Sequence, residues 1–149
     1  MKKIQALVVS AVLAIGMAAP ASAATSDPEV IIYRFPGVLD SGGADNTGAA
    51  TTFHCTNFSG SIELFRFVTR RGDTTIASNI TVMAAHLESF TRSTKLTNAY
   101  GEFSLSTGML PGQGTTAIAA TSINVVCTAM TIDASTVVPV GVAFLLDVD

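Results

Sequence analysis

The chain has 149 residues and a formal net charge of −3, and only 13% of its residues are charged. This length corresponds to one domain with a modest hydrophobic core. Because nucleic acids and anionic membranes are bound by basic surfaces, the acidic balance argues against both as partners.

The N-terminus has the features of a secretory signal peptide. Lys2 and Lys3 form a positive start, and residues 4–17 are mostly apolar. This apolar run is shorter than the roughly 20 residues that a membrane-spanning helix needs. We therefore predict a cleavable leader over residues 1–23 and no membrane span in the mature chain.

The predicted cleavage site has small residues at the two positions that the signal peptidase reads. Ala21 and Ala23 form an A-x-A motif, and the mature protein would begin at Ala24. The mature chain then loses two of its eight basic residues and keeps 11 acidic ones, so its net charge becomes −5. We expect export to the periplasm or the exterior, with residues 24–149 forming a single domain.

The mature sequence consists of short apolar runs rich in Val, Ile, Phe and Thr, separated by Gly, Asn, Asp and Ser. This composition predicts strands and turns rather than helices. The first strand is predicted over residues 30–35, with a possible continuation after a bulge at Pro36-Gly37. Residues 40–48 are predicted to form a loop, and residues 50–58 the next strand.

The strongest strand pattern follows over residues 61–69, where Arg66 is expected to face away from the phenylalanines beside it. Arg71-Gly72-Asp73 is a cell-attachment tripeptide, but at this position it predicts a hairpin turn. Residues 80–98 have mixed patterning, and residues 100–105 alternate only weakly.

The C-terminal third contains one predicted turn and two or three strands. Residues 111–114 (PGQG) predict the turn, and residues 116–130 form one long strand or two short ones. Residues 137–148 predict the last strand, in which Pro139 and Gly141 indicate an edge or a bulge. Seven or eight strands at this spacing predict an antiparallel Ig-like β-sandwich.

The chain has two cysteines, Cys55 and Cys127. In an oxidising compartment they are expected to form an inter-strand disulfide, which would close a loop of about 73 residues and contribute roughly 4 kcal/mol. Phe53 shares the predicted core-facing side of its strand with Cys55. The alternative is a metal site that adds His54 and His86, but neighbouring strand residues such as His54 and Cys55 point to opposite faces.

Two segments around the cysteines carry a resemblance. Residues 53–57 (FHCTN) and 125–129 (VVCTA) are similar to a loose group of small secreted bacterial β-sandwich proteins of unassigned function. The resemblance implies export, a β-sandwich and the disulfide, and it implies no catalytic residue. Immunoglobulin domains proper differ, because this chain has no Trp and Val125 occupies the place of their corner tyrosine.

Catalytic candidates are few. His54 and His86 are the only histidines, and no nucleophile-elbow motif surrounds a serine. Glu63 and Glu88 could form a carboxylate pair, but exposed strand carboxylates are common. We therefore expect a non-catalytic protein without a cofactor.

The Gly-rich loop holds a possible calcium site. Asp40, Asp45 and Asn46 provide oxygen ligands of the kind that Ca²⁺ prefers, although their spacing matches no EF-hand. The simpler interpretation is a loop whose Asp and Asn side chains bond to the nearby backbone.

The expected function is contact through the protein surface, as a binding module for a protein or a glycan or as a component of the cell envelope. A first alternative is a self-assembling, pilin-like subunit that forms homo-oligomers by pairing edge strands near residues 30–35 or 137–146. A second alternative is a small secreted hydrolase that uses His54 or His86.

Overall fold

The computed structural model describes residues 31–144, so the expected leader and its cleavage site at Ala21, Ala23 and Ala24 lie outside the described residues. The described residues are all-β, as predicted, and contain no helix that could cross a membrane. The strands are β1 (Ile31–Asp40), β2 (Ala49–Asn57), β3 (Glu63–Arg70), β4 (Ile76–Ala84), β5 (Ser89–Ser93), β6 (Phe103–Ser104), β7 (Leu110–Ala120), β8 (Val125–Asp133) and β9 (Gly141–Phe144).

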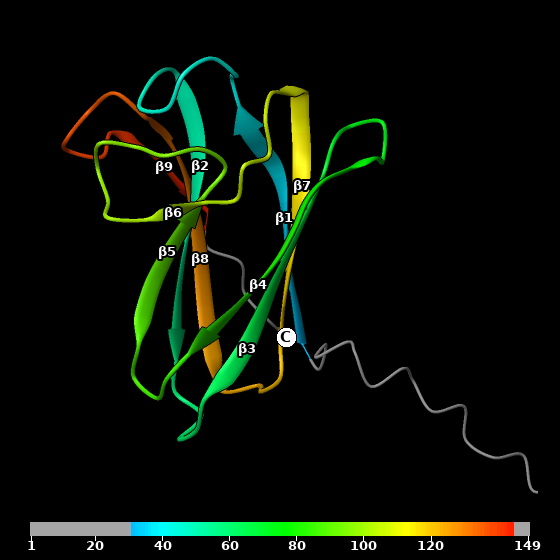
Figure 1. Cartoon of the computed structure of the whole chain (residues 1–149), viewed down its shortest axis with the longest axis vertical. Helices are drawn as coiled ribbons and strands as arrows, with labels where there is room; N and C mark the ends of the chain where they lie inside the picture. The colour runs from blue at the N-terminus through cyan, green and yellow to red at the C-terminus, as the bar shows by residue number, and fades with distance from the viewer. Residues whose placement is uncertain (1–30, 145–149) are drawn as a thin grey trace, which may run out of the picture.

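These strands belong to one sheet that curls into a half-barrel (Figure 1). Four strands in the order β4-β3-β7-β1 form one arm, which we call the β3 arm. In the other, the β2 arm, β2 lies between β5 and β8, with β6 beside β5 and β9 beside β8. The arms are joined where Asp40 pairs with Ala50. The curl turns their apolar faces towards each other, which creates the core.

One strand pair is parallel, so the expectation of a purely antiparallel sheet is wrong. β6 runs in the same direction as β5, with Arg92 opposite Phe103. The segment over residues 94–102 leaves β5 and brings the chain back to its edge. A parallel neighbour requires such a crossover, because a tight turn would reverse the direction of the chain.

The predicted disulfide between Cys55 and Cys127 is confirmed. The two residues lie directly opposite each other on β2 and β8, with their Cα atoms 4.2 Å apart. The bridge therefore links neighbouring strands of the β2 arm, whereas an Ig-like bridge would cross between two sheets. Both sulfurs are used in this bond, so the alternative metal site with His54 and His86 is wrong.

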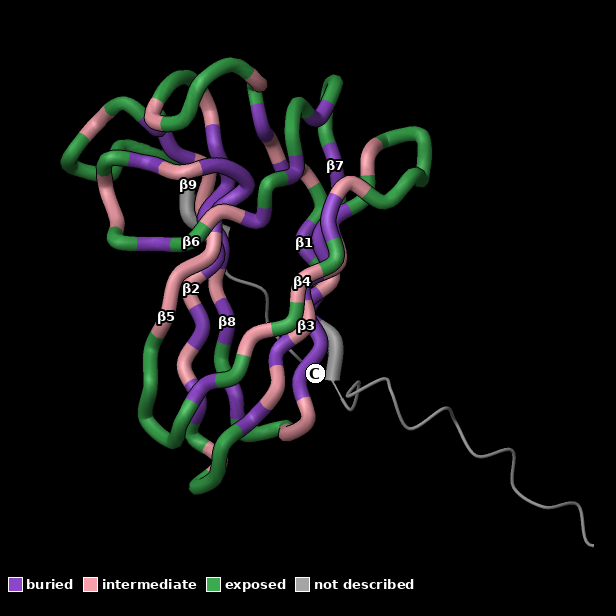
Figure 2. The backbone as a smooth tube through the Cα atoms, in the orientation of Figure 1, coloured by how far each residue is buried: buried purple, intermediate pink, exposed green. Residues whose placement is uncertain are grey.

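Aromatic side chains from both arms fill the space between them, and Figure 2 shows buried residues along the strands of both arms. Phe35, Phe53 and Phe67 come from β1, β2 and β3 and are fully buried. The Phe53 ring lies 5.5 Å from that of Phe35 and 6.1 Å from that of Phe67, centroid to centroid. The prediction that Phe53 faces the core is thus confirmed, and each such ring contributes about 1.5–3 kcal/mol by burial.

The prediction of a turn at residues 111–114 is wrong, because these residues lie within β7. The register of β7 against β1 shifts there, and Gly112 has a positive φ of 73°. A Cβ atom on Gly114 would lie 2.6 Å from the carbonyl oxygen of Arg70 on the neighbouring strand. The Pro-Gly-rich residues therefore form a bulge that fits β7 between β1 and β3.

Several other predictions are confirmed. β1 has an irregular register after Pro36, and the chain reverses at residues 71–75 between β3 and β4. The apolar run over residues 116–130 divides into β7 and β8. β9 begins at Gly141, where a Cβ atom would collide with the carbonyl oxygen of Thr131, so glycine permits the close approach of β9 to β8.

Candidate functional site

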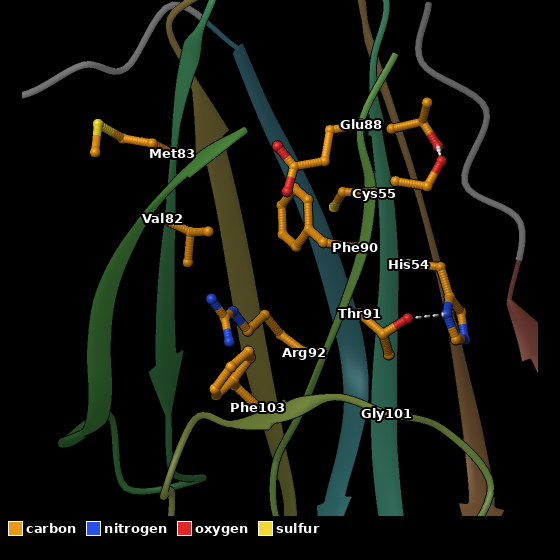
Figure 3. Close-up of a pocket in the computed structure, with 12 residues that line it drawn as sticks. His54, Cys55, Val82, Met83, Glu88, Phe90, Thr91, Arg92, Gly101 and Phe103 are labelled. Atoms are coloured by element: carbon orange, nitrogen blue, oxygen red, sulfur yellow. Dashed lines mark hydrogen bonds between the residues drawn. The ribbon is translucent and has the colours of Figure 1, made fainter. Parts of the chain in front are cut away.

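A hollow of about 400 Å³ opens along the seam where β4 and β5 diverge (Figure 3). The two strands are joined by the turn over residues 85–88, but β4 pairs with β3 and β5 pairs with β2. Leu105 closes the other end of the seam. Its N–H donates to the Ser93 carbonyl at 2.7 Å, and its carbonyl accepts the Ser78 hydroxyl at 2.6 Å. We call this hollow, fixed at both ends, the seam pocket.

Apolar side chains form much of the seam pocket. The half-buried Phe90 ring meets Phe65 and Phe67 edge-on, with centroids 5.0 and 6.2 Å away. Val82 lines the pocket from β4, and Met83 lies at its rim with 69% of its surface exposed. An apolar group placed here would cover the accessible side of Phe90.

Arg92 brings a positive charge into the seam pocket. Its guanidinium lies over the Phe103 ring, with Cζ 4.7 Å from the ring centroid, as Figure 3 shows. The buried Nε atom has no hydrogen-bond partner among the described residues. Burial lowers the pKa of Arg92, but an arginine side chain stays protonated in proteins. The other charged residue of the pocket, Glu88, accepts the Ala85 N–H at 2.7 Å and so closes its own turn.

His54 belongs to β2, pairs with Thr91 of β5 and also lines the seam pocket (Figure 3). Its Nδ1 is 2.9 Å from the Thr91 hydroxyl and its Nε2 is 3.2 Å from the Thr52 hydroxyl, while its ring packs against Tyr100. Burial lowers the pKa of His54, and the negative charge of Glu102 partly opposes this shift. Thr52 is fully buried, so its hydroxyl is not positioned to attack a substrate.

The other catalytic candidates have local partners. His86 accepts the Gly60 N–H at its Nδ1, at 3.0 Å. Glu63 accepts hydrogen bonds from Thr121 and Ser61, and these bonds lower its pKa, that from Thr121 most strongly. Within residues 31–144, no group of three or more His, Cys, Asp or Glu side chains is arranged to hold a metal ion.

The loop considered as a calcium site is held by a buried lysine. Lys95 Nζ lies 3.1 Å from Asp40 Oδ1, and both side chains are almost completely buried. The same ammonium donates to the carbonyl oxygens of Gly42 and Thr47. A calcium ion that used Asp40 and these carbonyls would have to displace the ammonium, which already neutralises the carboxylate.

Asp45 and Asn46, the other two residues of the calcium prediction, connect the loop to the 94–102 segment by hydrogen bonds. Leu96 donates its N–H to Asp45 Oδ1 at 3.2 Å, and the Asn46 N–H donates to the Leu96 carbonyl at 2.9 Å. Asn46 has a positive φ of 60°, which Asn tolerates better than most residues. Both residues therefore have roles in loop structure.

A second hollow, of about 650 Å³, lies on the outer face of the β3 arm. Its lining includes Arg34 from β1 and Arg66 and Arg70 from β3, and no acidic residue from the described part of the chain. Thr115 and Ala117 of β7 lie between the two strands and contribute small side chains. We call this hollow the arginine groove.

The sheet register determines the spacing of these arginines. Arg34 lies opposite Ala117, and Ala117 lies opposite Val68. Arg66 and Arg70 flank Val68 on the same face of β3, so their Cα atoms are separated by about 13 Å along the strand. Arg34 lies two strands away, at about 10 Å.

Hydrogen bonds hold the two β3 arginines in place. Arg66 Nε donates to Asn79 Oδ1, and Arg70 Nη1 donates to the Thr74 carbonyl, both at 2.9 Å. The alternation of β3 could have revealed that Arg66 and Arg70 share a face. The addition of Arg34 depends on the strand order β1-β7-β3, for which the sequence contains no local signal.

Comparisons of the chain with known protein families, curated proteins and solved structures find no significant match. The function is therefore argued from the geometry and charge of these two hollows.

Proposed function

We propose that this chain is an exported, non-catalytic binding protein whose arginine groove holds an extended acidic glycan. The observation that carries the proposal is the separation of charge. The chain as a whole is acidic, yet Arg34, Arg66 and Arg70 gather on one sheet face, and within residues 31–144 no acidic residue lines their groove.

The spacing favours a ligand with several charges. Three guanidinium groups whose backbones lie about 10–13 Å apart suit negative groups repeated along a chain better than one small anion. Guanidinium groups bind carboxylates and sulfates in planar, two-bond geometry. The hydrogen bonds to Asn79 and Thr74 already restrain Arg66 and Arg70, so these side chains lose less entropy on binding.

The groove lining also distinguishes among polymers. Its aromatic residue, Phe35, is buried in the core and offers no ring face for stacking. Single-stranded nucleic acids are held by stacking as well as charge, and duplexes by larger basic surfaces. A carboxylated or sulfated polysaccharide needs only the charges and the small-residue floor that the groove provides.

Titration with heparin or polygalacturonate tests this function, with neutral dextran as the reference polymer. We expect the acidic polymers to bind and dextran not to bind. Replacing Arg34, Arg66 and Arg70 together by Gln should weaken binding by about tenfold or more, because each exposed charge pair contributes up to about 1 kcal/mol. Binding should also weaken as salt is raised.

Arg71→Gln is the matched control, since it removes one nearby positive charge in the β3–β4 turn, outside the groove. It should leave affinity nearly unchanged. Unaltered affinity of the triple variant would contradict the proposal, as would tighter binding of duplex DNA than of either acidic polysaccharide at the same salt concentration.

A second candidate function is self-assembly, and the C-terminal region favours it. Val137, Val138 and Val140 are more than 70% exposed and lead into β9, which pairs with β8 at the edge of the described sheet. An apolar segment beside a strand edge is a template for pairing with another chain. The other predicted edge, near residues 30–35, pairs with β7 on one side and meets β2 only at Asp40.

Light scattering and negative-stain imaging of the purified protein test this second function. Assembly through β9 should give filaments or a defined oligomer, and Val138→Lys should reduce them because a charge opposes edge pairing. A monomer that persists at high concentration would exclude assembly and leave the glycan proposal intact.

A further inference from the structure

The seam pocket combines an apolar interior with one cation, the Arg92 guanidinium. None of the arginines of the arginine groove lines this pocket. We propose that the seam pocket binds a small amphipathic carboxylate. The apolar body of the ligand lies against Phe90 and Val82, and its carboxylate accepts hydrogen bonds from Arg92. This site is separate from the proposed glycan site and does not require it.

Arg92 determines the charge of the ligand. A guanidinium removed from water is stabilised when its N–H groups find an acceptor, yet Nε is buried without one among residues 31–144. The contact with the Phe103 ring supplies only part of the lost hydration. The acidic group of the pocket, Glu88, is already engaged with the backbone of its turn. A ligand carboxylate would provide the missing acceptor in two-bond geometry.

The Phe103 ring now lies over the Arg92 guanidinium, and the ligand carboxylate reaches Nε when this ring turns aside. The Phe103 side chain is 71% exposed and belongs to the two-residue strand β6. Few contacts therefore oppose a rotation of the ring away from the guanidinium. The ring can then cover the ligand as it now covers Arg92.

The remaining lining determines the apolar part. A volume of about 400 Å³ lies at the lower end of the range for small-molecule sites, so it admits one ring or a short alkyl chain. Phe90 offers its accessible side, Val82 adds an aliphatic wall, and the mobile thioether of Met83 can adapt to either shape. The seam pocket is therefore too small for the extended polysaccharide that is proposed for the arginine groove.

Hydrocinnamate and octanoate are suitable probes, with hydrocinnamamide as the neutral match for the first. Binding to the purified protein is followed by calorimetry and by amide NMR spectra. We expect both carboxylates to bind and to shift the amide signals of Phe90, Arg92 and Phe103. The amide should bind about tenfold more weakly or not at all, because it has the same shape without the charge.

Two variants and one control complete the experiment. Arg92→Gln should lower carboxylate affinity to that of the amide, and Val82→Phe should block binding while the cation remains. Arg34→Gln removes the same charge in the arginine groove and should leave affinity unchanged. Each variant is first compared with the parent by thermal unfolding, so that a loss of binding is not confused with a loss of fold.

Three results would overturn the proposal. The first is equal affinity of the parent and Arg92→Gln for hydrocinnamate. The second is a set of NMR shifts that maps to Arg34, Arg66 and Arg70, which would assign the probe to the arginine groove. The third is the absence of binding by either carboxylate at millimolar concentration. None of these results bears on the binding of heparin, so the two proposals fail independently.

Discussion

Two connections in this protein have similar turn-forming composition but are held together differently. The loop over residues 41–48 follows β1 and is fastened by the buried ion pair of Asp40 with Lys95. The turn over residues 71–75 is closed by its own side chains, where Asp73 Oδ1 accepts the N–H of Thr75 at 3.0 Å and its hydroxyl at 2.6 Å. Figure 1 shows both at the same end of the molecule.

The difference teaches that composition predicts a turn without predicting its anchor. In the β3–β4 turn every partner of Asp73 lies within a few residues, so the turn forms from local bonds. In the β1–β2 loop the anchoring ammonium comes from Lys95, after β5, more than 50 residues along the chain. The β3–β4 turn is therefore part of a local hairpin, whereas the β1–β2 loop depends on the completed fold.

The largest effect is expected at the buried ion pair. Lys95→Met would leave the Asp40 carboxylate buried without its cation, which should lower the free energy of unfolding by about 3–5 kcal/mol. Urea denaturation of the parent and the variant measures this loss. A loss below about 1 kcal/mol would show that the loop holds itself, as the β3–β4 turn does.

The double variant Asp40→Leu/Lys95→Met is the control for that experiment. It removes both charges and should recover much of the lost stability, because apolar replacements of similar volume can substitute for a buried pair. If it were as unstable as Lys95→Met, the ammonium would act through the carbonyls of Gly42 and Thr47 rather than through the carboxylate.

The disulfide is expected to have the next largest effect. It joins β2 to β8, so it strengthens the arm that follows the anchored loop. Replacing Cys55 and Cys127 by Ala should lower the free energy of unfolding by about 2–4 kcal/mol through the added entropy of the unfolded chain. Hydrogen exchange should increase in β2 and β8 before it increases in β3 and β4. An equal increase in all four strands would contradict this order.

The smallest effect is expected in the β3–β4 turn. Asp73→Ala removes both side-chain bonds to Thr75 and should speed hydrogen exchange of the Thr75 N–H, with little change in global stability. Asp45→Ala in the other loop is the matched control, and there Asp40, held by Lys95, should keep the Gly42 N–H protected. Equal loss of protection in the two loops would remove the distinction between them.

The same turn should respond to acid. The hydroxyl of Thr75, and then its N–H, lower the pKa of Asp73 below its ordinary 3.8. The ionised carboxylate therefore stabilises the turn fully above pH 3.8, and this contribution is lost as the pH falls through the lowered pKa. Exchange of the Thr75 N–H, corrected for its intrinsic pH dependence, should rise in that range, while Asp73→Ala should show no such step.

Candidate sites could be predicted only where their residues are neighbours in sequence. Asp40 ends β1, and Asp45 and Asn46 lie in the loop that follows, so their closeness in sequence led to a calcium prediction. Lys95, from a distant segment, instead bonds to Asp40 and to the Thr47 carbonyl of that loop. The arginine groove was missed for the opposite reason, since Arg34 joins Arg66 only through strand β7. In both cases the decisive neighbour comes from a remote part of the chain.

By itself, the sequence determined the all-β class, most strand positions, the bulge after Pro36 and the pairing of the two cysteines. These follow from period-two patterning, backbone restrictions and the small number of cysteines, all of which are local or combinatorial properties. The tertiary structure alone decided the strand order, the parallel pairing of β6 and the use of residues 111–114 as a bulge. It did so because the same residues can form a turn or a bulge, and only the neighbouring strands determine which of the two is stable.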